Sequence, residues 1–225
     1  MKAAIVYVFP NTPDAQRTEL AARFVCSYKA HPAEHDHDTI VVLNGSGGAG
    51  EGFVGALFAS LPNLRIIKHD NSGWDLGAFQ FAARSHPCDL MMFFGVSAWF
   101  PKAGWMRRAV DATRVRGLAV YGSHGNQGNG VNVWPHVRTT GWWVNPQLLN
   151  RYPVIVTDPG QRYPFEHGPT CFCQWAKSQG VLTWVVAWDG EYPIEHCDII
   201  QNGFHRGDQG NLLFRDRLTD PPYYA

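Results

Sequence analysis

The sequence predicts a single α/β domain with a mostly parallel sheet, flanked by helices and followed by a less regular C-terminal part. Short β-branched or apolar runs alternate with amphipathic stretches through the first half of the chain. This alternation is typical of parallel strands joined by crossover helices. A length of 225 residues suits one large domain rather than two. No linker or internal repeat divides the chain, so we expect one domain over residues 1–225.

Each expected element follows from a local pattern. The run 3–8 is apolar and β-branched, and helical spacing follows behind Thr12 as a cap and Pro13 at the first helical position. The expected strands of the first half are 3–8, 39–43, 64–68, 90–94 and 118–121, with helices over 13–28, 53–60, 75–84 and 104–115. In the second half, strands are expected at 137–144 and 182–187, a helix at 169–177, and mostly loop over 202–220.

Composition and charge argue against several classes of protein. Lys and Arg number 19 against 19 Asp and Glu, whereas nucleic-acid and anionic-membrane binders usually carry a basic excess. No apolar run approaches the roughly 20 residues that cross a bilayer. We therefore expect no nucleic-acid partner, no transmembrane segment and a cytoplasmic location. The 5 cysteines are odd in number and irregularly spaced, which predicts reduced thiols rather than a disulfide framework.

Ligands of such sheets bind outside the carboxyl ends of the strands, where helix N-termini also point. The loops expected at this edge are 9–12, 44–52, 69–75, 95–101 and 122–130. They contain no Gly-x-Gly-x-x-Gly of dinucleotide enzymes, no P-loop and no Gly-x-Ser-x-Gly nucleophile elbow. His31, His35 and His37 form a polar cluster with Asp36 and Asp38, which we expect to be a solvated loop at the opposite edge.

Three stretches carry a resemblance to a known family. They are Asn44-Gly45-Ser46, Asn71-Ser72-Gly73-Trp74-Asp75-Leu76-Gly77-Ala78 and Gly104-Trp105-Met106. Together they resemble the nucleotide-binding half of the GT-A glycosyltransferases, above all the family 2 enzymes and the rhamnan-synthesis-type relatives, over residues 3–153. The resemblance implies a GT-A-like, Rossmann-like fold in which 1–130 bind the nucleotide and 131–225 form the acceptor and closing half. It also implies transfer of a sugar from a nucleotide-sugar donor to a hydroxyl of a saccharide or similar acceptor.

The resemblance implies a donor site on the loops that follow the strands. Short polar side chains and glycines let the backbone approach ribose and phosphates, and Asp75 can accept a hydrogen bond from a base edge. Alternatively, Asp75 stabilises its own helix from the first turn. In this family a C-terminal loop often closes over the donor phosphates, which points to His205 and Arg206, with a salt-bridged tail as the alternative. The expected donor-binding residues are Phe9, Asn11, Asn44, Ser46, Asn71, Trp74, Asp75, Gly77, Ser97, His205 and Arg206.

The segment 136–143 resembles a strand that lies under the acceptor in the rhamnan-synthesis-type relatives. Its expected acceptor-binding residues are Arg138, Thr139 and Trp142. A guanidinium here can pair with a phosphate, and an indole face can stack on a sugar ring. The alternative is a plain core strand.

The expected catalytic residues lie in the second half. An inverting transfer needs a group that takes the proton of the acceptor hydroxyl. Glu166 stands where family 2 enzymes carry an acidic catalytic residue before a helix; His167 is its alternative and Asp189 a reserve base. The competing interpretation of Glu166 is a carboxylate at a helix entry. A retaining mechanism needs no such base, and the fold hosts both mechanisms.

The family's Asp-x-Asp motif, which holds Mn²⁺ or Mg²⁺ against the donor diphosphate, has no counterpart here. Gly95-Val96-Ser97 stands in its place. Divalent cations of this kind need oxygen ligands, so we expect no metal ligands and no cofactor besides the nucleotide-sugar substrate. The missing motif also motivates an alternative function, a non-catalytic nucleotide- or carbohydrate-binding module on the same fold. A nucleotidyltransferase or sugar-phosphate hydrolase on a related sheet is a third hypothesis.

Overall fold

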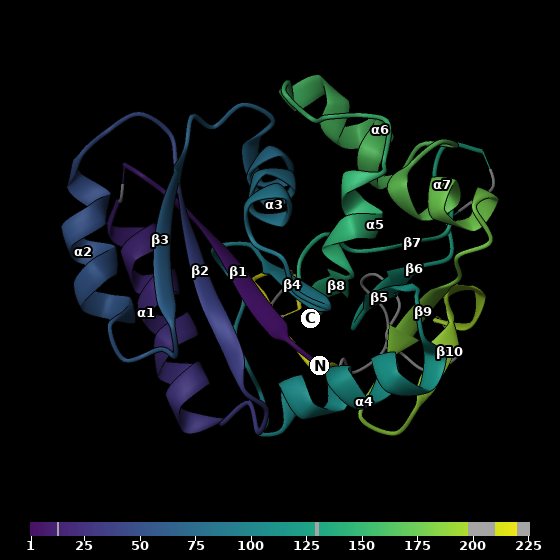
Figure 1. The fold of residues 1–225 in the computed structure, drawn as a ribbon, viewed down its shortest axis with the longest axis horizontal. Coiled ribbons are helices and arrows are strands. Elements are labelled where there is room, and N and C mark those ends of the chain that lie inside the picture. Colours follow the sequence, from purple (N-terminus) through teal and green to yellow (C-terminus); the bar gives the residue numbers. More distant parts are fainter. Residues whose placement is uncertain (13, 129–130, 198–209, 220–225) are drawn as a thin grey trace.

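The computed structural model describes residues 1–12, 14–128, 131–197 and 210–219. It contains a central sheet of 8 strands in the order β10-β9-β5-β8-β4-β1-β2-β3, and a separate pair, β6-β7 (Figure 1). The strands are β1 (Ala3–Pro10), β2 (His37–Asn44), β3 (Leu64–His69), β4 (Leu90–Phe94), β5 (Val120–Gly122), β6 (Gly125–Asn126), β7 (His136–Val137), β8 (Trp142–Val144), β9 (Thr183–Val186) and β10 (Glu191–Pro193). The helices are α1 (Ala15–Ala30), α2 (Ala49–Phe58), α3 (Trp74–Ser85), α4 (Trp105–Arg116), α5 (Pro146–Asn150), α6 (Arg162–Glu166) and α7 (Phe172–Ser178), with 3-10 turns η1 (Pro159–Gln161) and η2 (Ile194–His196).

The sheet is mostly parallel, as the sequence predicts. β1 pairs in parallel with β2 and β4, β2 with β3, and β5 with β9. β8 runs antiparallel between β4 and β5, and β10 runs antiparallel to β9 at the edge. The first four strands therefore end at the same edge of the sheet, which is where the loops expected to bind ligands lie.

The strand expected over 137–144 is divided in two. Its first part pairs with β6, and its second part, β8, enters the central sheet. The break falls at Gly141, whose φ of 65° lies in the left-handed region that favours glycine. Its N–H donates to Phe93 O over 2.9 Å, and an added Cβ would lie 2.9 Å from the Phe214 ring. The turn thus needs glycine for both its backbone angle and its close packing.

Two hydrophobic layers cover the sheet. Ile5 and Tyr7 pack with α1, α2 and α4 on one face, whereas Val6 and Val8 pack with α3, α5, α6 and α7 on the other. This alternation follows from the period of two along a strand.

The expected helices of the first half are all present, but α1 begins after Asp14 rather than after Thr12. The Asp14 side chain accepts from Arg17 N over 2.7 Å and so caps the helix.

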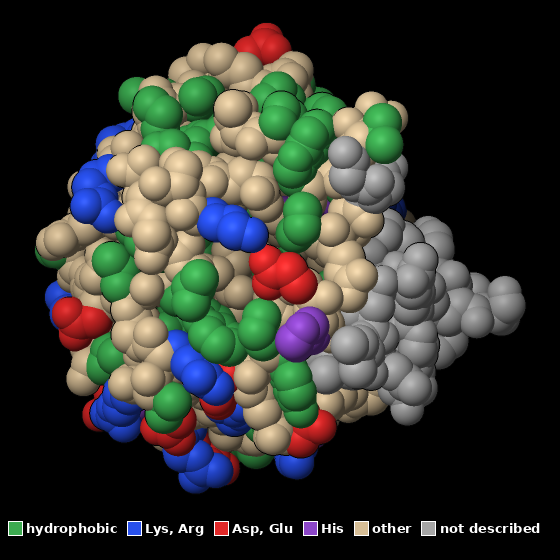
Figure 2. All heavy atoms as spheres, turned by 90° about the vertical axis from the view of Figure 1, so that its right-hand side faces the viewer, with side chains coloured by type: hydrophobic (Ala, Val, Ile, Leu, Met, Phe, Trp, Pro, Cys, Tyr) green, Lys and Arg blue, Asp and Glu red, His purple; other side chains and the backbone are tan. Residues whose placement is uncertain are grey.

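No helix in the described parts of the chain is long and apolar enough to span a membrane. As predicted, none of the 5 cysteines, all of which lie in the described ranges, forms a disulfide bond. On the face shown in Figure 2, Lys and Arg side chains lie among Asp and Glu side chains rather than in a patch of one sign. This mixture agrees with the balanced charge of the sequence.

Candidate functional site

A cavity of about 550 Å³ lies at the carboxyl end of β4. The loop Gly95–Ser97 lines one wall, and the first turn of α3 and the helix α6 line others. This is the edge of the sheet where the sequence predicts a ligand site. The charged or titratable side chains in its wall are Asp75, His136, Arg138, Arg162, Tyr163, Glu166, His167, Asp216 and Arg217.

Glu166 is fixed in this cavity by two donors. It is buried, with 8% of its surface exposed, and it is the last residue of α6. Thr139 Oγ1 donates to Oε1, and Arg162 Nε donates to Oε2 over 2.9 Å. The structure therefore brings two predicted residues, Thr139 and Glu166, into direct contact. The helix-entry interpretation of Glu166 is wrong, because the residue ends one helix and the next, α7, begins only at Phe172.

Asp75 lines the same cavity from the first turn of α3. Its Oδ1 accepts from Leu76 N over 3.1 Å. Burial raises the pKa of Asp75, and the Glu166 carboxylate raises it further while the Arg162 guanidinium lowers it. Asp75 thus occupies the helix position that its alternative interpretation requires and is also part of the cavity wall.

Two histidines form a chain of contacts that leads away from Glu166. His136 Nδ1 lies 2.7 Å from Trp134 O, and His167 Nδ1 lies 3.1 Å from His136 Nε2. His167 Nε2 in turn lies 3.7 Å from Glu166 Oε2. Burial lowers the pKa of His136 to about 4 and also lowers the pKa of His167, although Glu166 opposes the second shift. Both rings are therefore neutral near pH 7.

Three arginines supply positive charge to the cavity. Arg138 Nη2 pairs with Asp216 Oδ2 over 2.8 Å, and Arg162 pairs with Glu166. Arg217 also lines the cavity and is exposed. No hydrogen bond or ion pair joins it to another residue in the described ranges. His205 and Arg206, the cations expected from the C-terminal loop, lie outside the described residues.

The remaining polar residues of the expected donor site lie at the ends of β1, β2 and β3, outside the cavity wall. Asn44 Nδ2 donates to Asn71 Oδ1 over 2.7 Å, and Asn44 Oδ1 lies 2.7 Å from His69 Nδ1. Asn11 Nδ2 donates to Gly45 O over 3.0 Å, whereas its buried Oδ1 has no partner among the described residues. Ser46 is exposed. The structure therefore brings the three asparagine-bearing loops together, largely through bonds between their own side chains.

Several expected site residues do not reach the cavity. Phe9 is fully buried in the core beside Phe53, and Trp142 is buried against Phe93 with ring centroids 4.7 Å apart. Neither ring is available to a ligand, so both assignments need correction. The cause is strand alternation, which turns each ring toward a helix layer.

Three further assignments fall at the edge of the site or beyond it. A Cβ on Gly77 would lie 2.0 Å from Ser72 O, so this glycine serves close backbone packing. Asp189 is exposed and accepts from Asn211 Nδ2 over 2.8 Å, away from the cavity wall. Trp74 is 45% exposed, with its ring centroid 6.0 Å from the Arg162 guanidinium carbon. Ser97, in contrast, lines the cavity as expected.

The residues that sequence reasoning missed are His136, Arg162, Asp216 and Arg217. Arg162 could have been found, because it stands four residues before Glu166, the spacing of an ion pair on a helix. His136 gave no such signal, since its contact with His167 depends on the fold. Arg217 lies further along the C-terminal tail than His205 and Arg206, the two cations that the resemblance indicated.

Comparison with known proteins shows which solved structures this fold resembles. No family profile and no curated protein sequence matches the chain. Among solved structures, mouse xyloside xylosyltransferase 1 in its apo form matches with a TM-score of 0.53, covering 83% of this chain and 85% of that chain at 11% identity. The chain has the GT-A fold.

Two further structures share the GT-A fold of this chain. A Bacillus anthracis protein described as a glucose-1-phosphate thymidylyltransferase, in complex with sucrose, matches with a TM-score of 0.54 over 80% of this chain and 85% of that chain, at 14% identity. S. aureus TarS matches with a TM-score of 0.50 over 68% of this chain but 30% of that chain, at 13% identity. The chain thus spans less than half the length of the TarS structures that it matches.

The described residues of this GT-A domain do not fit a divalent metal ion. The loop Gly95–Ser97 carries no carboxylate. Glu166 is paired with Arg162, and Asp216 with Arg138. Among residues that the structure describes, no three His, Cys, Asp or Glu side chains are grouped as metal ligands.

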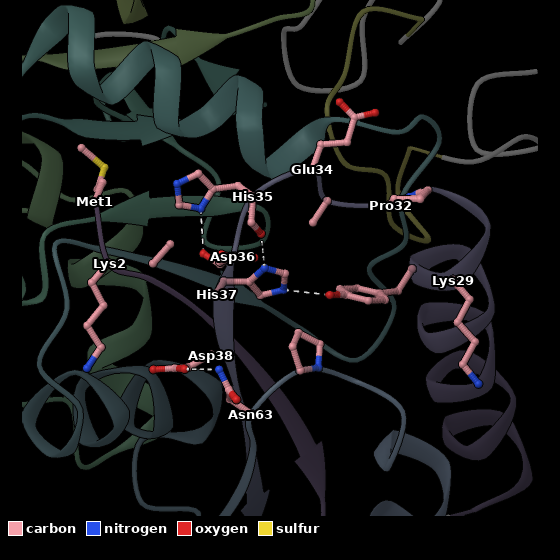
Figure 3. Close-up of a pocket in the computed structure, with 14 residues that line it drawn as sticks. Met1, Lys2, Lys29, Pro32, Glu34, His35, Asp36, His37, Asp38 and Asn63 are labelled. Carbon is pink, nitrogen blue, oxygen red and sulfur yellow. Dashed lines mark hydrogen bonds between the residues drawn. The ribbon is translucent and has the colours of Figure 1, made fainter.

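A larger hollow of about 1070 Å³ lies at the opposite edge of the GT-A sheet, beside the amino ends of β1 and β2 (Figure 3). It contains the predicted cluster around His35 and His37. His37 Nε2 lies 2.9 Å from Tyr28 Oη, and Asn63 Nδ2 donates to Asp38 Oδ1 over 2.9 Å. These polar side chains bond to their neighbours rather than converge on a common point. The expected position at the opposite edge is confirmed, but the expectation of a solvated loop is wrong for His37 and Asp38, which begin β2, and His37 is buried. The cavity at the carboxyl edge is the better candidate site.

Proposed function

We propose that this GT-A protein transfers a sugar from a nucleotide-sugar donor to a hydroxyl acceptor. A fold shared at 11–14% identity does not carry an activity, so the proposal rests on the site. The observation that supports it best is the convergence of Glu166, Asp75 and the guanidinium groups of Arg138, Arg162 and Arg217 on one cavity. The cavity therefore combines an anchored carboxylate with one cation, Arg217, that has no ion pair among the described residues and suits a diphosphate.

Glu166 is the proposed base. Thr139 and Arg162 donate to its two oxygens and orient the carboxylate without occupying all of its lone pairs. An acceptor hydroxyl at the remaining lone pair can give up its proton as its oxygen bonds to the sugar. The leaving nucleoside diphosphate then keeps the electron pair of the broken bond. This assignment corresponds to an inverting transfer.

The donor is proposed to span two groups of residues. Asn11, Asn44, Ser46 and Asn71 at the ends of β1, β2 and β3 would hold the nucleoside, with Asp75 at the junction with the cavity. Arg217 would meet the diphosphate, because it is a cation of the cavity wall with no ion pair among the described residues. Guanidinium groups bind phosphate oxygens through paired N–H donors. The acceptor would lie over Thr139 and Arg138.

A thermal-shift screen of UDP-, GDP- and dTDP-sugars, with and without Mn²⁺, tests donor binding. A donor that binds the folded state raises the melting temperature in proportion to RT ln(1 + [L]/Kd). The donor that binds is then incubated with saccharide acceptors, and release of the nucleoside diphosphate is measured. No shift with any nucleotide-sugar would contradict the donor assignment.

A second candidate function is a nucleotide- or carbohydrate-binding module without catalysis. It is favoured by one observation, the absence of carboxylates from Gly95–Ser97. Binding of a nucleotide-sugar with no release of the diphosphate, across the acceptors tested, would support this candidate over the transferase.

A further inference from the structure

We propose that His136 is a positioning residue that fixes His167 in one tautomer, so that His167 and Glu166 act as a single proton-accepting pair. The inference rests on the proposed function for its catalytic meaning. The tautomer that it assigns depends only on the geometry of three side chains and one carbonyl.

The first step concerns the proton on His136. Its Nδ1 lies 2.7 Å from Trp134 O. A carbonyl oxygen only accepts hydrogen bonds, so Nδ1 must carry the proton. The ring is buried, with 3% of the residue exposed, which disfavours a second proton. His136 Nε2 therefore presents a lone pair.

The second step fixes His167. Its Nδ1 lies 3.1 Å from His136 Nε2. Since His136 offers an acceptor there, His167 must donate from Nδ1. The neutral His167 ring consequently has its lone pair on Nε2, the nitrogen 3.7 Å from Glu166 Oε2.

The third step follows from that contact. A lone pair and a carboxylate oxygen facing each other repel, whereas one proton between them satisfies both. The 3.7 Å separation is longer than a hydrogen bond, so a proton taken from the acceptor hydroxyl by Glu166 can reach His167 Nε2 through one bridging water. The ring then becomes an imidazolium that still donates to His136. Because 33% of the His167 side chain is exposed, water can then remove the proton.

The surroundings of His167 involve four other groups. Arg162 on α6 disfavours a positive ring, whereas Glu166 favours it. His136 contacts it from β7, and the Tyr163 ring lies 5.3 Å away between centroids. Arg162 thus favours return of the proton from His167, and Glu166 favours its arrival.

The test is the tautomer of His167, read from the ¹⁵N shifts of the imidazole nitrogens in the full chain near pH 8. The signals are assigned by their loss in His167→Asn. In the unmodified protein we expect a protonated Nδ1 and an unprotonated Nε2. His136→Phe, which removes the acceptor, should shift His167 toward the Nε2–H tautomer. His136→Gln, whose amide oxygen can accept from Nδ1, should retain the original tautomer.

An Nε2–H tautomer in the unmodified protein would overturn the proposal, and so would an unchanged tautomer in a folded His136→Phe. If His136→Phe does not fold, the spectra of the unmodified protein and of His136→Gln decide the question. The exposed His196, changed to Gln, is the matched control and should leave the His167 signals unchanged.

Turnover provides a second and separate readout. His136→Phe should lower kcat on the order of tenfold or more, with rescue by His136→Gln. The tautomer spectra need no substrate, so a failure of the proposed function would leave that test intact. If His136→Phe shifts His167 to the Nε2–H tautomer as expected but turnover is unchanged, the tautomer assignment stands and the positioning role is overturned.

Discussion

Arg162 and Glu166 lie one helical turn apart on α6, and Arg162 Nε donates to Glu166 Oε2 over 2.9 Å. Thr139, from the segment between β7 and β8, donates to the other carboxylate oxygen. Two separate parts of the chain therefore orient one buried carboxylate at the carboxyl edge of the sheet. A side chain held in this way loses little freedom when a substrate hydroxyl arrives, which favours proton transfer.

Asp75 gives a prediction that separates binding from stability. Burial raises the pKa of Asp75 in the folded protein, so its contribution to stability falls as pH rises through the range between its ordinary and folded values. Asp75→Asn removes the buried titrating carboxyl and should leave stability unchanged or raise it. Nucleotide-sugar binding, measured by calorimetry, should weaken roughly tenfold, because the amide does not reproduce both acceptor oxygens that the carboxyl offers to a base edge. Equal affinity in both proteins would remove Asp75 from the donor site.

Arg217 is expected to act on the diphosphate alone. Arg217→Ala should weaken binding of the nucleoside diphosphate roughly tenfold and reduce its dependence on salt, because one charged contact is lost. Stability should stay within about 0.5 kcal/mol, since the side chain is exposed and has no ion pair among the described residues. Arg114→Ala on α4 is the matched control. If both variants bind equally well, the phosphate assignment fails.

Donor binding is expected to persist in excess EDTA. The reason is the absence of carboxylates from Gly95–Ser97 and the pairing of Glu166 and Asp216 with arginines. The measurement is the thermal shift with the best donor before and after chelation. Loss of the shift in EDTA and its return with Mn²⁺ would show that carboxylates elsewhere hold a metal.

His136 should make the folded protein less stable as the pH falls. Its pKa is lowered to about 4 in the fold, against an ordinary value of 6.5. Between these values the unfolded chain takes up a proton that the folded protein does not, so stability is lost as pH falls through this window. Between pH 7 and 4, the free energy of unfolding of His136→Gln should fall by up to about 3 kcal/mol less than that of the parent protein. Urea unfolding at several pH values measures this difference, with His196→Gln as the control. The prediction is wrong if the unfolding free energies of the parent and of His136→Gln change equally with pH.

Local patterns predicted the first half of the fold well. The strands β1 to β4 and the helices between them follow from apolar runs and helical spacing, which are properties of neighbouring residues. The position of β8 does not follow from such patterns. Its antiparallel pairing with β4 and β5 depends on a turn at Gly141 and on contacts between distant segments.

The candidate site was predicted only in part, because its position follows from local patterns whereas several of its contacts join distant segments. The edge of the sheet follows from strand order, and Glu166, His167, Thr139 and Asp75 meet there. Phe9 and Trp142 were misassigned because their burial depends on which face of the sheet each helix layer covers. His136 could not be predicted, since its role arises from a contact with a residue 31 positions away.

The most direct test of the account is turnover and donor affinity measured on Glu166→Gln, with the exposed Glu195→Gln as the control. Gln keeps the shape of the side chain and removes the proton acceptor, so kcat should fall roughly 10²–10⁴-fold while the donor Kd changes little. The loss of charged pairing with Arg162 should lower stability by about 1–2 kcal/mol, which leaves the protein folded. Normal turnover in folded Glu166→Gln would contradict the account.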